Sequence, residues 1–76
     1  MNERNIIGHR IKYFRKLKQM TQEELSAKLI VMGVNIDRPM ISRIESQSRE
    51  ITDIEILAIA KALKVSIDDL FSNLGR

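Results

Sequence analysis

The sequence contains no cysteine and a single histidine, His9. Disulfide bonds and thiolate zinc sites are therefore excluded, and a histidine-based metal cluster is implausible. We expect no metal, no cofactor and no role for His9, which lies beside an apolar stripe and should be at the surface. A chain of 76 residues buries only about 60–65% of its unfolded surface, so its core is small and dimerisation would help it.

Long apolar runs, β-hairpin turn dipeptides, internal repeats and low-complexity tracts are also absent. Residues 1–20 resemble neither a secretory signal nor a membrane span, so we expect a cytoplasmic protein. The apolar residues recur instead at helical spacing along the whole chain. We therefore predict an all-α fold, a compact five-helix bundle in which residues 1–76 form one domain with its core in residues 6–71.

The helices are predicted over residues 6–18, 22–32 and 38–46, then from a cap at Thr52 or Asp53 through Leu63, and from 67 onward. Gly33 is a natural stop for the second helix because glycine tolerates positive φ. The fourth helix is apolar on nearly every face and should be mostly buried. The apolar face of the first helix is predicted to consist of Ile7, Ile11, Phe14 and Leu17.

The net charge of +3 is unevenly distributed, because residues 1–20 carry six cations against Glu3 alone. Such a cationic segment favours a polyanionic partner, since neutralised phosphates release condensed counterions. A solvated amphipathic helix would have the same composition. Charge alone leaves both interpretations open.

Two short helices around a turn follow this basic segment. Thr21 can cap the first of them while Glu24 reaches back to the amide of the cap. The second, residues 38–45, places arginines on its outer side and Ile41 and Ile44 toward the core, against Leu25 and Leu29. This order is typical of a helix-turn-helix motif, whose second helix reads bases in the DNA major groove.

The outer side of this second helix supplies candidate base contacts, since arginine can donate two hydrogen bonds to guanine. The candidates are Arg38, Met40, Ser42 and Arg43. Both arginines could instead be solvated or bound to surface carboxylates. Candidate phosphate contacts are the helix start at Thr21 and Gln22, the neighbouring Lys16 and Lys18, and Arg49 beyond the second helix.

Four segments together resemble the Xre/Cro family of phage-repressor-type regulators, over about residues 6–71. They are Ile7-Gly8-x-Arg10-Ile11-x-x-x-Arg15-x-x-Lys18, Thr21-Gln-Glu-Glu-Leu25, Ile41-Ser42-Arg43-Ile44-Glu45 and Leu57-x-x-Ala60-Lys61-Ala62-Leu63-x-Val65-Ser66-x-Asp68-x-Leu70. The resemblance implies a lambda-repressor-like bundle that binds double-stranded operator DNA as a homodimer. It also implies that Arg15 pairs with Glu45, that Gln22 binds phosphate, and that Pro39 joins Arg38 and Arg43 at base-facing positions.

The sequence departs from this family between Leu25 and Ile41, where residues 30–37 add length. We expect an extended second helix and a looser connection to the third. Pro39 removes side-chain hydrogen bonding from a position that often reads bases, and no glycine follows the third helix.

A sequence-specific transcriptional regulator, acting as a repressor, explains these features together. An antitoxin-like or partner-binding module of the same fold would instead use apolar surface from Ile6, Ile30, Val31, Met32 or Leu74. An enzyme fits poorly, because the carboxylate pairs at 23–24 and 68–69 fall at helix starts, where the helix dipole explains them. No small-molecule substrate is indicated. Phe71 and Leu74 are candidate dimer contacts, although both could simply close the core.

Overall fold

The computed structural model describes residues 3–72, and within this range every regular element is a helix. The helices are α1 (Gly8–Leu17), α2 (Gln22–Val31), α3 (Arg38–Glu45), α4 (Asp53–Leu63) and α5 (Ile67–Phe71). The predicted all-α, five-helix fold is confirmed. None of these helices is both long enough and apolar enough to cross a lipid bilayer.

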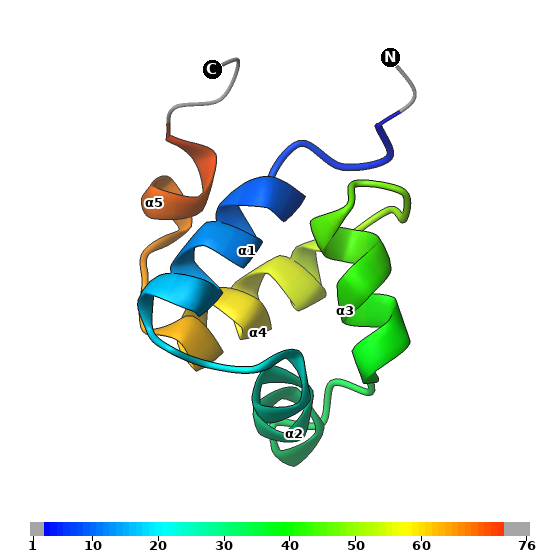
Figure 1. The fold of residues 1–76 in the computed structure, drawn as a ribbon, viewed down its shortest axis with the longest axis vertical. Coiled ribbons are helices and arrows are strands. Elements are labelled where there is room, and N and C mark those ends of the chain that lie inside the picture. Colours follow the sequence, from blue (N-terminus) through cyan, green and yellow to red (C-terminus); the bar gives the residue numbers. More distant parts are fainter. Residues whose placement is uncertain (1–2, 73–76) are drawn as a thin grey trace.

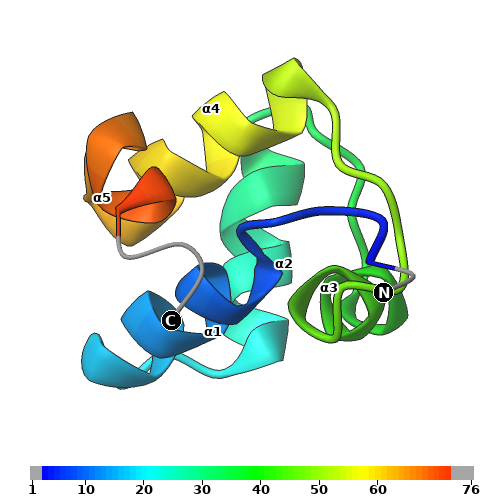
Figure 2. The same ribbon diagram turned by 90° about the horizontal axis from the view of Figure 1, so that it is seen from above.

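The five helices surround a single core. Figure 1 shows α1 and α4 side by side, with α3 to the right of both, α2 beneath them and α5 at the upper left. The view from above in Figure 2 shows α2 running behind α1 toward α4, with α3 seen nearly end-on. The α2–α3 pair therefore packs as a unit against the other helices, which leaves one side of α3 facing outward.

The core is built from aliphatic side chains of all five helices. Leu25 and Leu29 of α2 are fully buried together with Ile41 and Ile44 of α3, as the helical spacing predicts. The remaining fully buried large side chains are Ile7, Ile11, Ile36, Ile59, Leu63 and Leu70. Burial of this apolar surface is the main force that holds the two helices of the motif in a fixed relation.

Each helix after α1 begins at a polar cap that the sequence shows in advance. Thr21, Thr52 and Ser66 form capping boxes, each with the acidic residue three positions later. At α3 the Asp37 side chain accepts a hydrogen bond from the Met40 amide at 2.9 Å. These bonds satisfy amides that lack a partner within the helix, so the first turns are fixed.

The connection between α2 and α3 differs from the expectation. As predicted, α2 ends near residue 32, at Val31, and Gly33 after it adopts a left-handed conformation with φ of 85°. The connection is not loose, however, since Ile36 is fully buried and its carbonyl accepts a 2.7 Å hydrogen bond from the Ser26 hydroxyl. The added residues 32–37 therefore bring one more aliphatic side chain into the core.

Three apolar side chains lie in places that periodicity did not predict. Leu17, expected on the buried face of α1, is 60% exposed, while the nearby Arg15 is buried. Ile54 and Leu57 of α4 are 69% and 49% exposed, although we expected this helix to be mostly buried. The cause is that α4 packs on the core through Ala58, Ile59, Ala62 and Leu63, and its opposite side is left uncovered.

Candidate nucleic-acid interface

The outward side of α3 carries most of the predicted base-reading residues. Arg38, Pro39, Ser42 and Arg43 are exposed, while the helix is anchored from its other side by Ile41 and Ile44. Met40 is only half-exposed because it also packs against the core. The arrangement leaves two guanidinium groups and one hydroxyl free to approach a ligand. Figure 1 shows α3 at the edge of the molecule, with its outer side unobstructed by the other helices.

A buried ion pair ties the end of α3 to α1. The Arg15 Nε atom donates to Glu45 Oε2 at 2.6 Å, and Arg15 Nη2 donates to Glu45 Oε1 at 3.1 Å. The exposed fractions of the two side chains are 9% and 3%. A two-bond pair of this kind has a defined geometry, so it fixes where α3 ends relative to α1. Arg15 is therefore committed to the protein interior.

Gln22, at the start of α2, joins the same cluster. Its side-chain amide donates to Glu45 Oε1 at 3.0 Å. A glutamine amide has two hydrogens, so one remains available to an external acceptor. The neighbouring Thr21 is exposed, and its hydroxyl accepts from the Glu24 amide while retaining its own hydrogen to donate. Both groups can therefore contact a phosphate without giving up their structural bonds.

The other predicted phosphate ligands are cations, and their surroundings differ. Lys16 and Lys18 are exposed at the end of α1, and neither takes part in an ion pair with the described residues. Arg49 is half-buried, and its guanidinium donates to both carboxylate oxygens of Glu55 at 3.1 and 3.0 Å. Arg49 is thus held in place, with its outer edge at the surface.

Arg49 also lines a shallow hollow of about 490 Å³ just beyond the end of α3. The other residues that line it are Arg4, Arg43, Ser48, Glu50 and Thr52. Three arginines and one acidic residue line the hollow, and Arg4 Nη1 lies 3.7 Å from the Glu50 carboxylate. The lining therefore carries a net positive charge, which favours an anion. Arg4 and Ser48 are not among the contacts predicted from the sequence.

Asn5 is a further residue that sequence reasoning missed. Its side-chain oxygen accepts from the amides of Gly8 at 2.6 Å and Ile7 at 3.2 Å, so it satisfies the first amide of α1 from two residues before the N-cap. Its side-chain nitrogen donates to the carbonyls of Ile44 at 3.1 Å and Arg49 at 2.8 Å. One buried side chain therefore joins the start of α1 to the end of α3. An asparagine just before a helix is a recognised local signal for a cap, but its long-range partners leave no trace in the sequence.

The Arg49–Glu55 pair predicts a pH dependence of stability. Hydrogen bonds from the Arg49 guanidinium, helped by the Thr52 amide, lower the pKa of Glu55 below its ordinary value of 4.5. A carboxyl whose pKa is lowered by folding stabilises the protein above its unfolded pKa, and that contribution is lost as the pH falls through the folded pKa. We expect Glu55→Gln to cost about 1 kcal/mol at pH 7 and to flatten the loss of stability below about pH 4.5.

Urea unfolding at pH 7 and at pH 3 measures this effect, with Glu23→Gln as the control. Glu23 is an exposed residue in the first turn of α2. If Glu55→Gln lost as much unfolding free energy between pH 7 and pH 3 as the wild type, this pair would not link stability to pH.

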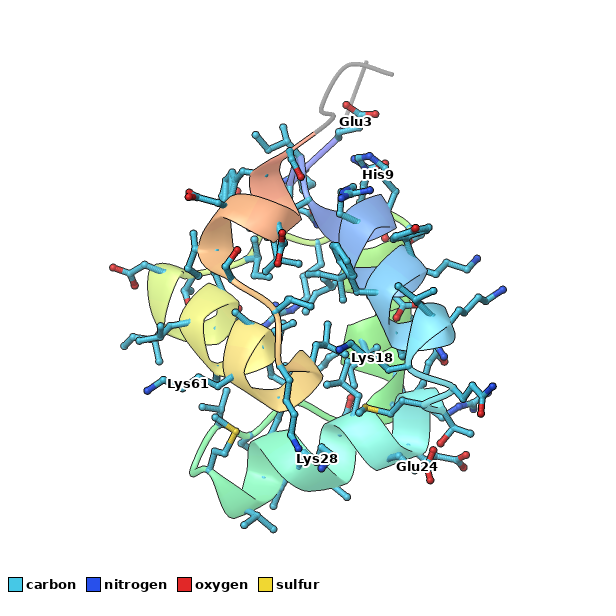
Figure 3. The ribbon with its side chains drawn as sticks, turned by 90° about the vertical axis from the view of Figure 1, so that its left-hand side faces the viewer. Glu3, His9, Lys18, Glu24, Lys28 and Lys61 are labelled. Carbon is cyan, nitrogen blue, oxygen red and sulfur yellow. The ribbon has the colours of Figure 1, made fainter. Side chains whose placement is uncertain are left out.

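The predicted dimer contacts lie at or beyond the end of the described residues. Phe71 is 38% exposed at the end of α5, beside the core residue Leu70, and Leu74 lies outside the described residues. Within residues 3–72, no three histidine or acidic side chains gather closely enough to hold a metal ion. His9 is exposed on α1 and is labelled in Figure 3, away from α3.

Comparison with known proteins agrees with the helix-turn-helix fold. A model of the helix-turn-helix family matches residues 11–70. Among solved structures, the chain is similar to the restriction-modification controller protein C.AhdI from Aeromonas hydrophila, with 29% sequence identity and a TM-score of 0.72. That similarity covers 86% of this chain and 87% of the controller protein. No curated protein matches the sequence.

Proposed function

Because the chain belongs to the Xre/Cro family of helix-turn-helix DNA-binding regulators, we propose that it is a sequence-specific regulator that inserts α3 into the major groove of its operator. The observation that carries this proposal is the division of α3 into two sides. Ile41 and Ile44 hold the helix on the core, while Arg38, Ser42 and Arg43 remain exposed on the outer side.

Base recognition in this proposal comes from the outer side of α3. Arg43, and Arg38 at the first turn, each donate two hydrogen bonds to a guanine, and such a pair is worth about 1–3 kcal/mol of discrimination. Ser42 donates to a base or a phosphate. Pro39 and the exposed part of Met40 offer apolar contact to a thymine methyl. The buried Arg15–Glu45 pair keeps these groups in register by fixing the end of the helix.

Backbone contacts orient the domain on the duplex and carry most of the affinity. The proposed phosphate ligands are Lys16, Lys18, Thr21, Gln22 and Arg49, of which three are cations. The hollow beside Arg49 adds Arg4 to this set. Together these groups flank α3, so they would grip the two strands that border the groove.

A single recognition helix covers only a few base pairs, so we further propose that the protein binds as a homodimer across two half-sites and represses by covering the promoter. Phe71, with Leu74 beyond it, is the proposed subunit contact, because Phe71 retains exposed aromatic surface at the end of α5. Sedimentation of Phe71→Ser tests the contact, since loss of the interface would leave a monomer. An unchanged dimer would place the interface elsewhere.

A salt titration of duplex binding tests the proposed function. We expect log K to fall with log salt at a slope of roughly −3.6 for each bound subunit, because four cations, Arg4 included, approach phosphates. Lys16→Ala should reduce that slope by about 1 per subunit, whereas Lys12→Ala, on the same helix, should not. If no selected duplex binds at any salt concentration, an antitoxin-like or partner-binding module on the same fold becomes the better account.

A further inference from the structure

A hollow on the side of the molecule away from α3 has an apolar floor and a basic rim. It lies between the end of α2 and the end of α4, with a volume of about 410 Å³. Figure 3 views this side, with Lys28 on α2 and Lys61 on α4 labelled, and with α3 behind the other helices. The lining residues are Ala27, Lys28, Val31, Met32, Lys61, Ala62 and Lys64.

The lining of this hollow leaves two large apolar side chains in water. Val31 is 87% exposed, and Met32 is 41% exposed. Neither side chain is needed to close the core, which is already filled by Leu25, Leu29 and Ile36. Methionine adapts its shape to varied apolar partners. This exposed apolar surface therefore suits contact with another protein.

The rim is uniformly cationic. Lys28, Lys61 and Lys64 border the floor, no acidic residue lines this hollow, and none of the three forms an ion pair with the described residues. A second hollow of about 320 Å³ adjoins it and shares Ala27 and Lys28. Lys18 and Glu24 line that second hollow, and the Glu24 carboxylate is already engaged by the Thr21 amide at 2.8 Å. Because Lys18 is a proposed phosphate ligand, the groove is defined as the first hollow alone.

We propose that this groove binds an acidic amphipathic segment of a second protein. Apolar side chains of that segment would cover Val31 and Met32, and its carboxylates would face the three lysines of the rim. A two-fold contact between copies of this chain is disfavoured, because it would set lysines against lysines. A nucleic acid is disfavoured because its phosphates would leave the apolar floor uncovered. Since the groove and α3 lie on different sides, the segment could be held while DNA is bound.

The probe is a synthetic peptide with Leu and Phe along one helical side and Asp and Glu elsewhere. Titrated into the 15N-labelled chain, it should bind saturably and shift the amide signals of Ala27, Val31 and Ala62. Lys61→Glu should weaken binding about three- to tenfold, and Val31→Asp about tenfold. Both side chains are exposed, so these variants should fold normally.

Controls separate specific docking from general charge attraction. Lys12→Glu makes the same change in net charge on α1, outside the groove, and should weaken peptide binding less than twofold. A peptide with Asn and Gln in place of Asp and Glu should bind weakly.

Three results would overturn the proposal. They are weakening by Lys12→Glu equal to that by Lys61→Glu, amide shifts confined to residues outside the groove, and the absence of saturable binding. Groove signals that instead respond to dilution of the chain or to duplex DNA would also overturn it. Peptide binding is measured without DNA, so its failure would leave the proposed DNA binding untouched.

Discussion

Glu45→Ala is expected to destabilise the domain by about 3–5 kcal/mol, because it leaves the Arg15 guanidinium buried without its counter-charge. The two side chains are 9% and 3% exposed, and the carboxylate accepts two hydrogen bonds from Arg15 and one from Gln22. The Arg15 Nη1 bond to the Met20 carbonyl at 2.7 Å would remain, but it cannot neutralise the charge. Urea unfolding followed by circular dichroism measures the loss.

Two further variants show whether the missing charge is the cause. Glu50→Ala removes an exposed carboxylate that lies 3.7 Å from Arg4, and it should cost less than about 0.5 kcal/mol. The double variant Arg15→Met/Glu45→Met removes both charges and should recover much of the stability that Glu45→Ala loses. A Glu45→Ala cost below about 1 kcal/mol would contradict the account of the pair as the anchor of α3.

Gly8→Ala is expected to cost about 3 kcal/mol or more, although alanine is normally the better helix former by about 1 kcal/mol. A methyl group at Gly8 would overlap the carbonyl oxygen of Ile44. It would also lie 2.9 Å from Asn5 Oδ1 and 3.0 Å from the Ile44 carbonyl carbon. Backbone atoms cannot move aside without separating α1 from α3, so the clash should outweigh the gain in helix propensity.

The matched control is Gly33→Ala, which tests the cost of a left-handed backbone conformation without a steric clash. Gly33 has a positive φ, and nothing lies within 4 Å of the position that its Cβ would take. The expected cost is about 1 kcal/mol, from the left-handed backbone alone. The melting temperature of Gly8→Ala should therefore be well below that of Gly33→Ala. Stability of Gly8→Ala equal to the wild type would refute the close approach of α1 to α3.

Local patterns predicted the helices and the polar caps well. The capping boxes at Thr21, Thr52 and Ser66 are short-range signals, so the residues three positions apart contain all the information needed. The same holds for Ile41 and Ile44, whose spacing marks the inner side of α3. Features of this kind depend on one helix and its own hydrogen bonds, and the sequence displays them directly.

Features that depend on packing between distant segments were missed or misjudged. Asn5 bonds to the end of α3, some forty residues further along the chain. Periodicity predicted Leu17 in the core, but the structure leaves Leu17 exposed and buries Arg15 instead. Arg15 can be buried because its guanidinium pairs with the Glu45 carboxylate. The sequence predicted a loose connection around Ile36, but in the structure the Ser26 hydroxyl donates a hydrogen bond to the Ile36 carbonyl.

The candidate interface was only partly accessible to sequence reasoning for the same reason. Periodicity could distinguish the outer side of α3, so Arg38 and Arg43 were selected correctly as exposed groups. It could not foresee that Arg49 would be gripped by Glu55, or that Arg4 would lie near Arg43 across a shared hollow. The second placement follows from a long-range contact, the 2.8 Å hydrogen bond from the Arg4 amide to the Gln47 carbonyl.

Selection of bound duplexes from a random DNA pool, with wild type, Arg38→Ala and Arg43→Ala run in parallel, tests most directly whether α3 reads bases. We predict a defined wild-type site, and a loss of preference at particular base pairs in each variant, worth about 1–3 kcal/mol at those positions. Lys12→Ala should select the wild-type site. Uniform weakening across all sequences, or an unchanged site in both arginine variants, would contradict the account.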